Sequence, residues 1–159
     1  MKISELRRQV PMWPAQILDT LADERTWVQD GGSMFLQSDR TEGLRLTASI
    51  PISHDQIPTA AQRFLGAEAK VVQHISSDPV ADDATESNLR ITAEIPGAPI
   101  DVQVDTSLLR APDDVTALHA RITIECPLPL VGPMIESSAQ PYIESMISQG
   151  FDKLSDPEV

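Results

Sequence analysis

Gln73 is one of three polar residues in this sequence whose type and neighbours could support binding chemistry. It alternates with Val71 and Ile75, so in a strand it shares one face with two aliphatic side chains. An amide among aliphatic groups could orient the polar head of a ligand, or it could lie at the rim of the sheet. The other strand register would turn His74 inward instead, and the sequence leaves these alternatives open.

Arg8 and Tyr142 are two further polar candidates. Arg8 lies between Leu6 and Val10 on one face of an expected strand. It could face a carboxylate ligand, but we expect its stem to cover apolar surface and its head to reach water. Tyr142, the only tyrosine, is expected near the centre of the apolar face of a long helix. We expect its hydroxyl to bond backbone or water, although a ligand oxygen is the alternative.

We find no motif for a metal, a cofactor or catalysis. His54, His74 and His119 are far apart, and none has metal-ligand spacing with another ligating residue. The acidic loop 78–86 lacks the glycine and spacing of a calcium loop. Cys126 is expected to face inward with no activating base. The phosphate-loop, dinucleotide and nucleophile-elbow patterns do not occur, so we expect no catalytic residue, metal or cofactor.

The elements that would position these residues are mostly strands. The sequence predicts strands over 2–10, 34–37, 43–50, 69–76, 89–95, 100–108 and 118–126, and the alternation of apolar with polar residues is clearest in 43–50, 89–95, 100–108 and 118–126. Pro14 to Asp30 has a helical rhythm and could form two short helices broken near Ala22-Asp23, and Pro58–Phe64 is a third short helix. Short turns between consecutive strands indicate an antiparallel sheet.

Gly132–Leu154 reads as one long amphipathic helix. Its expected apolar face contains Ile135, Ala139, Tyr142, Ile143, Met146, Ile147 and Leu154, with Ser137, Glu144, Ser148 and Asp152 roughly opposite. Pro141 removes the bond to the Ser137 carbonyl, so we expect a kink near 137–141 or a helix proper that begins at Pro141. Gly150, at the inner edge, is a second weak point.

Three stretches of the chain, together with the order of elements, carry a resemblance to a known superfamily. They are Ile57–Gly66, Ile95–Ile100 and Pro127–Glu136. The chain resembles the START-like (SRPBCC, helix-grip) superfamily, and within it a mainly actinobacterial domain-of-unknown-function family. Pro141 and the 4% aromatic content depart from what that resemblance leads us to expect. The resemblance implies an α+β fold in which a curved antiparallel sheet wraps around the C-terminal helix, with a hydrophobic cavity between them.

The inward side chains of the strands and the helix would either fill a core or line that cavity, because both need the same residues. The resemblance implies a small hydrophobic ligand, since relatives hold lipids, polyketides, sterols or quinones. The predicted ligand-binding residues are Tyr142, Met146, Ile135, Ala139, Ile143, Ile147, Leu89, Ile91, Val102, Val104, Ile122, Ile124 and Gln73. A cyclase or aromatase type of enzyme and a protein-interaction module remain the alternatives.

Composition restricts the partners and the compartment. The 159 residues suit a single domain, 1–159, and carry a net charge of −12 from 12 basic and 24 acidic side chains. Nucleic acid and anionic membrane surfaces need clustered cations, so we expect neither. No apolar run is long enough for membrane insertion, and the first residues lack a signal-peptide pattern. These features lead us to expect a cytoplasmic protein whose protein partner, if it has one, is unknown.

Overall fold

The structure is a computed structural model, and it describes residues 1–28, 31–52 and 69–155. Seven strands form one antiparallel sheet in the order β1-β7-β6-β5-β4-β3-β2. The strands are β1 (Lys2–Val10), β2 (Ser33–Ser38), β3 (Arg45–Pro51), β4 (Lys70–Ser77), β5 (Glu86–Glu94), β6 (Asp101–Ala111) and β7 (Val115–Glu125). The α-helices of the described residues are α1 (Pro14–Ala22), α2 (Glu24–Val28) and α4 (Gly132–Ser155). This is the predicted α+β helix-grip fold.

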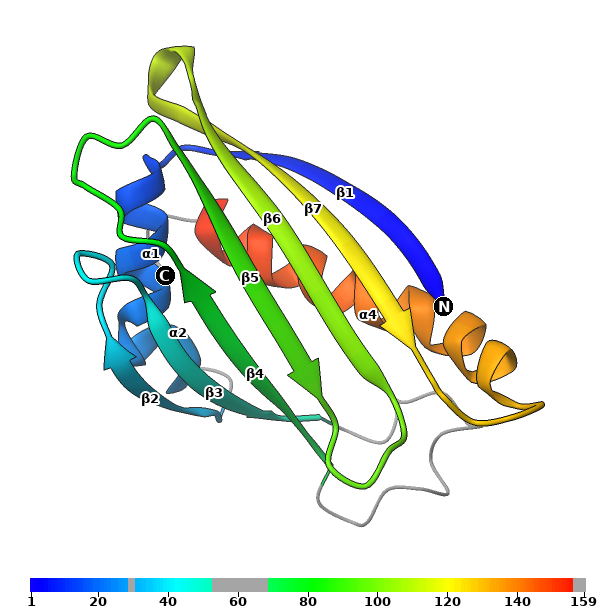
Figure 1. The fold of residues 1–159 in the computed structure, drawn as a ribbon. Coiled ribbons are helices and arrows are strands. Elements are labelled where there is room, and N and C mark those ends of the chain that lie inside the picture. Colours follow the sequence, from blue (N-terminus) through cyan, green and yellow to red (C-terminus); the bar gives the residue numbers. More distant parts are fainter. Residues whose placement is uncertain (29–30, 53–68, 156–159) are drawn as a thin grey trace.

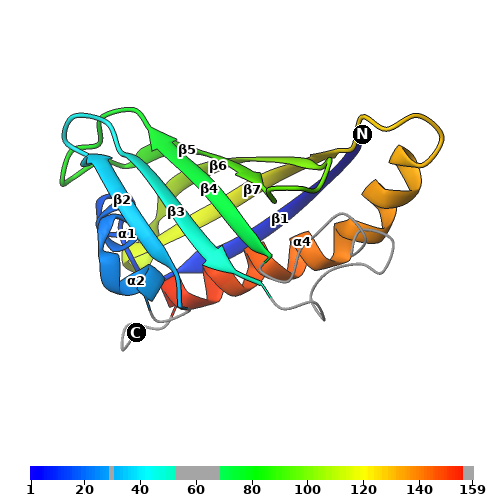
Figure 2. The same ribbon diagram turned by 90° about the horizontal axis from the view of Figure 1, so that it is seen from below.

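The sheet curves around α4, which crosses its concave side (Figures 1 and 2). We call the side that faces α4 the inner face and the opposite side the outer face. Each predicted strand is present with shifts of a few residues at its ends. β6 and β7 are the longest strands of the sheet, with 11 residues each. The predicted helix at Pro58–Phe64 lies outside the described residues.

Two short helices follow β1, as the sequence predicted. At the start of α1 the N–H of Trp13 donates to the Gln16 side chain at 2.8 Å, and Pro14 occupies the first turn. The helix α1 ends at Ala22, and α2 begins at Glu24, so Asp23 alone separates the two helices. Trp27 of α2 then packs into the core and donates from Nε1 to the Leu21 carbonyl at 2.8 Å.

Two of the three stretches that carry the resemblance are turns with specific backbone needs. In the β5–β6 connection Gly97 has φ +90°, and the N–H of Ala98 donates to the Ile95 carbonyl at 2.9 Å. Before α4 a Cβ on Gly132 would lie 2.4 Å from the Cys126 carbonyl oxygen. Gly97 and Gly132 therefore cannot be replaced by a larger residue without strain. These two motifs fix the backbone conformation of the turns in which they lie.

The long helix α4 is continuous through Pro141. Figure 2 shows its first turns bent relative to its C-terminal half, as the sequence predicted for a proline that lacks the bond to the Ser137 carbonyl. Gly150, expected at the inner edge of α4, is exposed instead.

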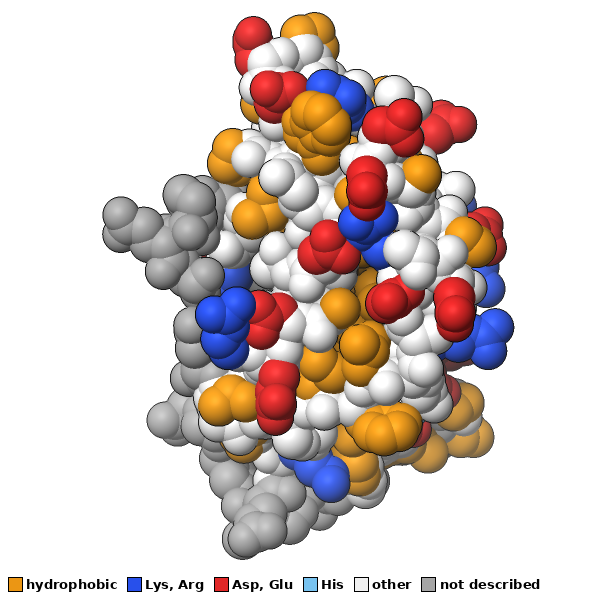
Figure 3. Space-filling view, turned by 90° about the vertical axis from the view of Figure 1, so that its left-hand side faces the viewer, with side chains coloured by type: hydrophobic (Ala, Val, Ile, Leu, Met, Phe, Trp, Pro, Cys, Tyr) orange, Lys and Arg blue, Asp and Glu red, His pale blue; other side chains and the backbone are white. Residues whose placement is uncertain are grey.

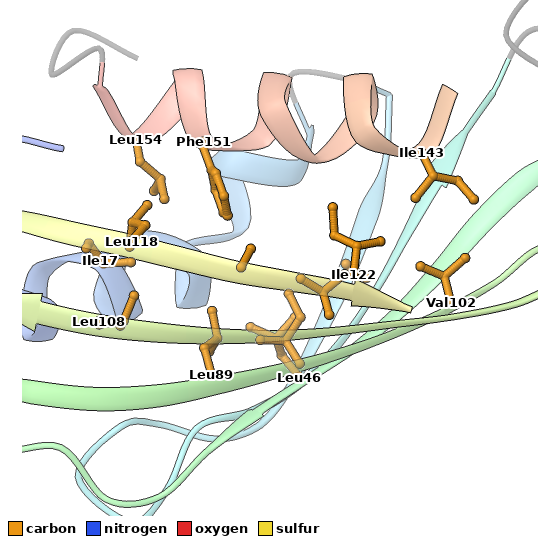
Figure 4. Packing of buried hydrophobic residues seen from close by; sticks show 14 of the residues in the cluster. Ile17, Leu46, Leu89, Val102, Leu108, Leu118, Ile122, Ile143, Phe151 and Leu154 are labelled. Carbon is orange, nitrogen blue, oxygen red and sulfur yellow. The ribbon is translucent and has the colours of Figure 1, made fainter. Parts of the chain in front are cut away.

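The core fills the space between the C-terminal half of α4, the short helix α1 and the inner face. Phe151 and Leu154 point from α4 toward the sheet, above Leu118 and Leu89 (Figure 4). Ile17 of α1 is 1% exposed and belongs to the same cluster. The core therefore joins the two ends of the chain to the middle of the sheet.

Candidate functional site

The strand residues predicted to bind ligand lie side by side on the inner face. Strand register gives two neighbouring rows that each cross five strands, from β7 to β3. The first row is Ile122, Val104, Ile91, Ile75 and Leu46; the second is Ile124, Val102, Ala93, Gln73 and Ala48. Leu89 lies one row further along, opposite Thr106. The structure thus brings all seven strand candidates onto one surface.

The inner face is covered unevenly. Ile122 and Ile124 of β7 are fully buried, and α4 contacts β7 and β1. By contrast, Ile91 and Ala93 of β5 and Gln73 of β4 are only half-buried, although they lie in the middle of the sheet. A side chain in that position stays accessible only where nothing packs fully over it. The accessible part of the inner face is therefore the region over β4 and β5 around Gln73, Ile91 and Ala93, since Ile75 and Leu89 in the same two strands are buried.

Gln73 supplies a polar group in that region. Its neighbours in the row, Ala48 and Ala93, have short side chains. Within the described residues no hydrogen bond engages its side-chain amide. The register that turns Gln73 inward and His74 outward was one of the two that the sequence left open. The amide can therefore donate to or accept from a bound molecule.

Two hydroxyl groups on the inner face are also unsatisfied. Ser4 lies opposite Ile122, and Thr106 lies between Ala120 and Leu89. Their Oγ and Oγ1 atoms are buried and have no hydrogen-bond partner in the described part of the chain. A buried hydroxyl without a partner costs about 1–3 kcal/mol, so such atoms often mark a water or ligand position. Alternation along the two strands is the sequence signal that indicates an inward position for both residues.

The α4 candidates divide into buried and exposed residues. Ile135, Ala139 and Ile143 are at most 7% exposed, and Met146 and Ile147 are half-buried. Tyr142 is 40% exposed, contrary to the expectation that it lies at the centre of the apolar face. The buried stripe runs through 135, 139, 143, 151 and 154, and one residue along a helix is a rotation of about 100°. Tyr142 therefore lies at the margin of the stripe, and Phe151, which the sequence reasoning omitted, lies within it.

Arg8 turns toward α4 and not toward the region over β4 and β5. Its Nη1 lies 2.6 Å from Asp152 Oδ1, and its Nη2 donates to Ser148 Oγ. The sequence had placed Ser148 and Asp152 opposite the packed face of α4, but both border β1. Arg8, Gln73 and Tyr142 were the polar groups that an enzyme would need to bring together. Arg8 is engaged elsewhere, and Tyr142 is partly exposed.

Glu136 is a buried charged residue that the sequence reasoning did not single out. It is 3% exposed; Oε2 accepts the N–H of Cys126 at 2.8 Å, and Oε1 lies 2.5 Å from the Met1 amino nitrogen. The Met1 ammonium, followed by the Cys126 N–H, lowers the pKa of the Glu136 carboxyl below its ordinary value. Since both partners fix it at the end of β7, Glu136 attaches the start of α4 to the sheet.

Two of the open hollows of the structure lie on the outer face of the sheet. The larger, of about 640 Å³, lies over β3 to β7, and the smaller, of about 330 Å³, lies over β4 to β7. Neither is lined by a residue of α4, so both are separate from the region over β4 and β5 on the inner face. Among the described residues, no group of three or more His, Cys, Asp or Glu side chains is placed to hold a metal ion. No described helix is long and apolar enough to cross a membrane.

Comparisons with known proteins identify a family and a fold. A family model described as "Protein of unknown function (DUF2505)" matches residues 5–154. The chain is also similar to a START superfamily protein from Mycobacterium smegmatis, at 11% identity and a TM-score of 0.55, with 99% of each chain covered. A protein from Thermus thermophilus has 12% identity, a TM-score of 0.58 and coverage of 97% of this chain and 94% of that one.

A conserved protein from Geobacillus kaustophilus is similar at 15% identity and a TM-score of 0.59, with 97% of this chain and 93% of that one covered. No curated protein matches the sequence. At these identities the solved structures establish the START-like fold and nothing about a ligand or a reaction.

Proposed function

We propose that this chain, which belongs to the DUF2505 family and has the START-like fold, binds a small hydrophobic ligand. The ligand would lie between α4 and the inner face. The ligand is of the lipid, polyketide, quinone or sterol-like kind. The observation that carries the proposal is the half-burial of Ile91, Ala93 and Gln73 in the middle of the sheet. Aliphatic side chains around one free amide match a ligand that is mostly apolar with one polar end.

The unsatisfied hydroxyls refine this picture. Thr106 is 2% exposed and its Oγ1 has no partner among the described residues. A ligand that carries a carbonyl or hydroxyl oxygen could satisfy such a group, whereas a pure hydrocarbon could not. We therefore favour ligands with one or two oxygen atoms over hydrocarbons. The remaining α4 candidates, Ile143, Met146 and Ile147, would contact the apolar part, and Met146 can adapt to varied shapes.

Native mass spectrometry of gently purified protein, followed by solvent extraction, tests the proposal. We expect a mass above that of the chain and an apolar, oxygen-containing compound in the extract. Protein that stays empty, both as purified and after incubation with a panel of fatty acids, quinones and sterols, would contradict it. Denatured protein serves as the control for adventitious lipid.

A protein-interaction module is supported by a separate observation. The loop before α4 and its first turn carry exposed apolar side chains: Leu130 is 98% exposed and Met134 is 55% exposed. The segment 126–135 contains no charged residue, and exposed apolar surface of this kind is common at interfaces. Figure 3 shows a different face of the molecule, over α1, α2 and β2. On that face the hydrophobic side chains occur in small groups among charged ones, unlike the uncharged segment before α4. Stable co-purification with one partner, lost in Leu130→Ser, would favour this second function.

A further inference from the structure

The outer face of the sheet carries a row of charged side chains, three of them arginines, that the inner-face site does not use. Strand register aligns one row across six strands: Glu5, Arg121, Asp105, Arg90, Ser76 and Arg45. Three of the chain's 12 basic residues therefore lie in one row, although the net charge is −12. This row crosses the larger outer hollow, which also includes Asn88, Ser107 and His119.

Arg45 and Arg90 flank a neutral residue in that row. Ser76 of β4 pairs with Arg45 of β3 on one side and with Arg90 of β5 on the other. Adjacent strands lie about 4.8 Å apart, so the two arginines are separated by about 10 Å along the row. An arginine side chain is long enough to cover half of that distance, so both guanidinium groups can reach an anion over Ser76.

Both guanidinium groups have donors to spare. Arg90 donates from Nε to Asp105 Oδ1 at 3.1 Å, and its two Nη groups have no partner among the described residues. Arg45 forms no hydrogen bond or ion pair within the described part of the chain, although acidic residues are abundant. Further donors are available in the same hollow from the Ser76 hydroxyl and the Asn88 amide.

We propose that this hollow binds one phosphate group between Arg45 and Arg90, above Ser76. Arginine recognises tetrahedral anions through paired N–H donors, which Arg45 and the Nη groups of Arg90 can supply. Asp105 already offsets the charge of Arg90, so Arg45 provides the uncompensated positive charge. Asp105 and Asp78, which also line the hollow, would repel a polyanion that extends along the row. The ligand is therefore a single phosphate group, either the free ion or a small phosphomonoester. The site is on the opposite side of the sheet from the inner-face ligand, so the two proposals are independent.

Titration of the labelled protein with inorganic phosphate, followed by amide NMR at an ionic strength of about 0.1 M, tests the proposal, because the screening length is then about 10 Å. We expect saturable shifts centred on residues 45, 76, 88 and 90, and about 10-fold weaker binding in Arg45→Gln and in Arg90→Gln. Arg121→Gln is the matched control because Arg121 lies in the same row beyond Asp105. It should weaken binding by less than about 2-fold, since a distant exposed charge is screened.

Two results would overturn the site. One is the absence of saturation by about 10 mM phosphate. The other is an equal loss in all three variants, which would indicate diffuse attraction by the arginines of the row. The unfolding midpoint in urea checks that each exposed substitution preserves the fold. Methyl phosphate distinguishes the ligand sources: equal or tighter binding assigns a phosphomonoester, and weaker binding assigns the free ion.

Discussion

Glu136 Oε2 accepts a hydrogen bond from the backbone N–H of Cys126 at a distance of 2.8 Å. This contact joins the second turn of α4 to Cys126, the residue that directly follows β7. Both partners are buried, so loss of the carboxylate leaves an N–H group without an acceptor. The position of α4 over the sheet therefore depends partly on one carboxylate.

Glu136→Ala should lower the free energy of unfolding by about 1–3 kcal/mol, because the Cys126 N–H would remain buried and unpaired. Urea denaturation at pH 7 measures the effect. Glu144→Ala, a half-buried change on the same helix, is the control and should cost less than about 1 kcal/mol. Equal losses in the two variants would mean that the contact with Cys126 contributes nothing particular.

The same carboxylate gives stability a defined pH dependence. The pKa of Glu136 is lower in the folded protein than in the unfolded chain. Between these two pKa values the folded protein therefore binds fewer protons than the unfolded chain. Its contribution is complete above the unfolded pKa of about 4.3 and is lost as the pH falls through the lower folded pKa. Glu136→Gln should lack this pH-dependent contribution to the free energy of unfolding. The difference in the free energy of unfolding between wild type and variant should therefore shrink below about pH 4.3. A constant difference from pH 3 to pH 7 would contradict the assignment.

Gly132 and Gly150 form a matched pair for substitution. Gly132→Ala should destabilise the protein by about 2 kcal/mol or more, since its Cβ would lie 2.4 Å from the Cys126 carbonyl oxygen. Gly150→Ala should stabilise it by about 0.5–1 kcal/mol, because nothing lies within 4 Å of the new Cβ and alanine favours helix. Thermal unfolding of both variants should therefore give shifts of opposite sign.

Pro141→Ala should stabilise α4 by about 1 kcal/mol, less than the roughly 3 kcal/mol that proline costs inside a straight helix, because the bend relieves part of the clash. Urea denaturation gives the change in stability, and native mass spectrometry gives the amount of retained ligand. Loss of ligand in a more stable variant would mean that the bend shapes the inner-face site. Unchanged retention would mean that the bend is only tolerated.

Gln73→Leu should change which ligand is retained, because it removes the amide from the accessible inner face. Relative to wild type, we expect compounds with a polar end to be depleted by about 10-fold and hydrocarbon-like ones to be kept, as loss of one buried hydrogen bond predicts. Gln103→Leu, a glutamine on the outer face, is the control. If both variants carry the same compounds as wild type, Gln73 does not orient the ligand.

Much of the fold follows from local patterns in the sequence. Period-two alternation in β3, β5, β6 and β7 predicted which side chains face inward, because a strand with one wet face must bury alternate residues. The proline and glycine signals at 14, 97 and 132 predicted helix starts and turns, since these residues restrict or extend the allowed backbone angles. These are short-range constraints, and neighbouring residues alone carry them.

The tertiary structure decided how those elements cover one another. Register alone placed Gln73 inward between Ala48 and Ala93, and only the path of α4 along β1 and β7 left that region accessible. The contacts of Arg8 with Asp152 and of Glu136 with Cys126 join residues that no local pattern relates. Helical periodicity gives the width of an apolar stripe but not its centre, so it placed Tyr142 too deep and omitted Phe151. Burial depends on which surface packs against the helix, and that is a property of the whole fold.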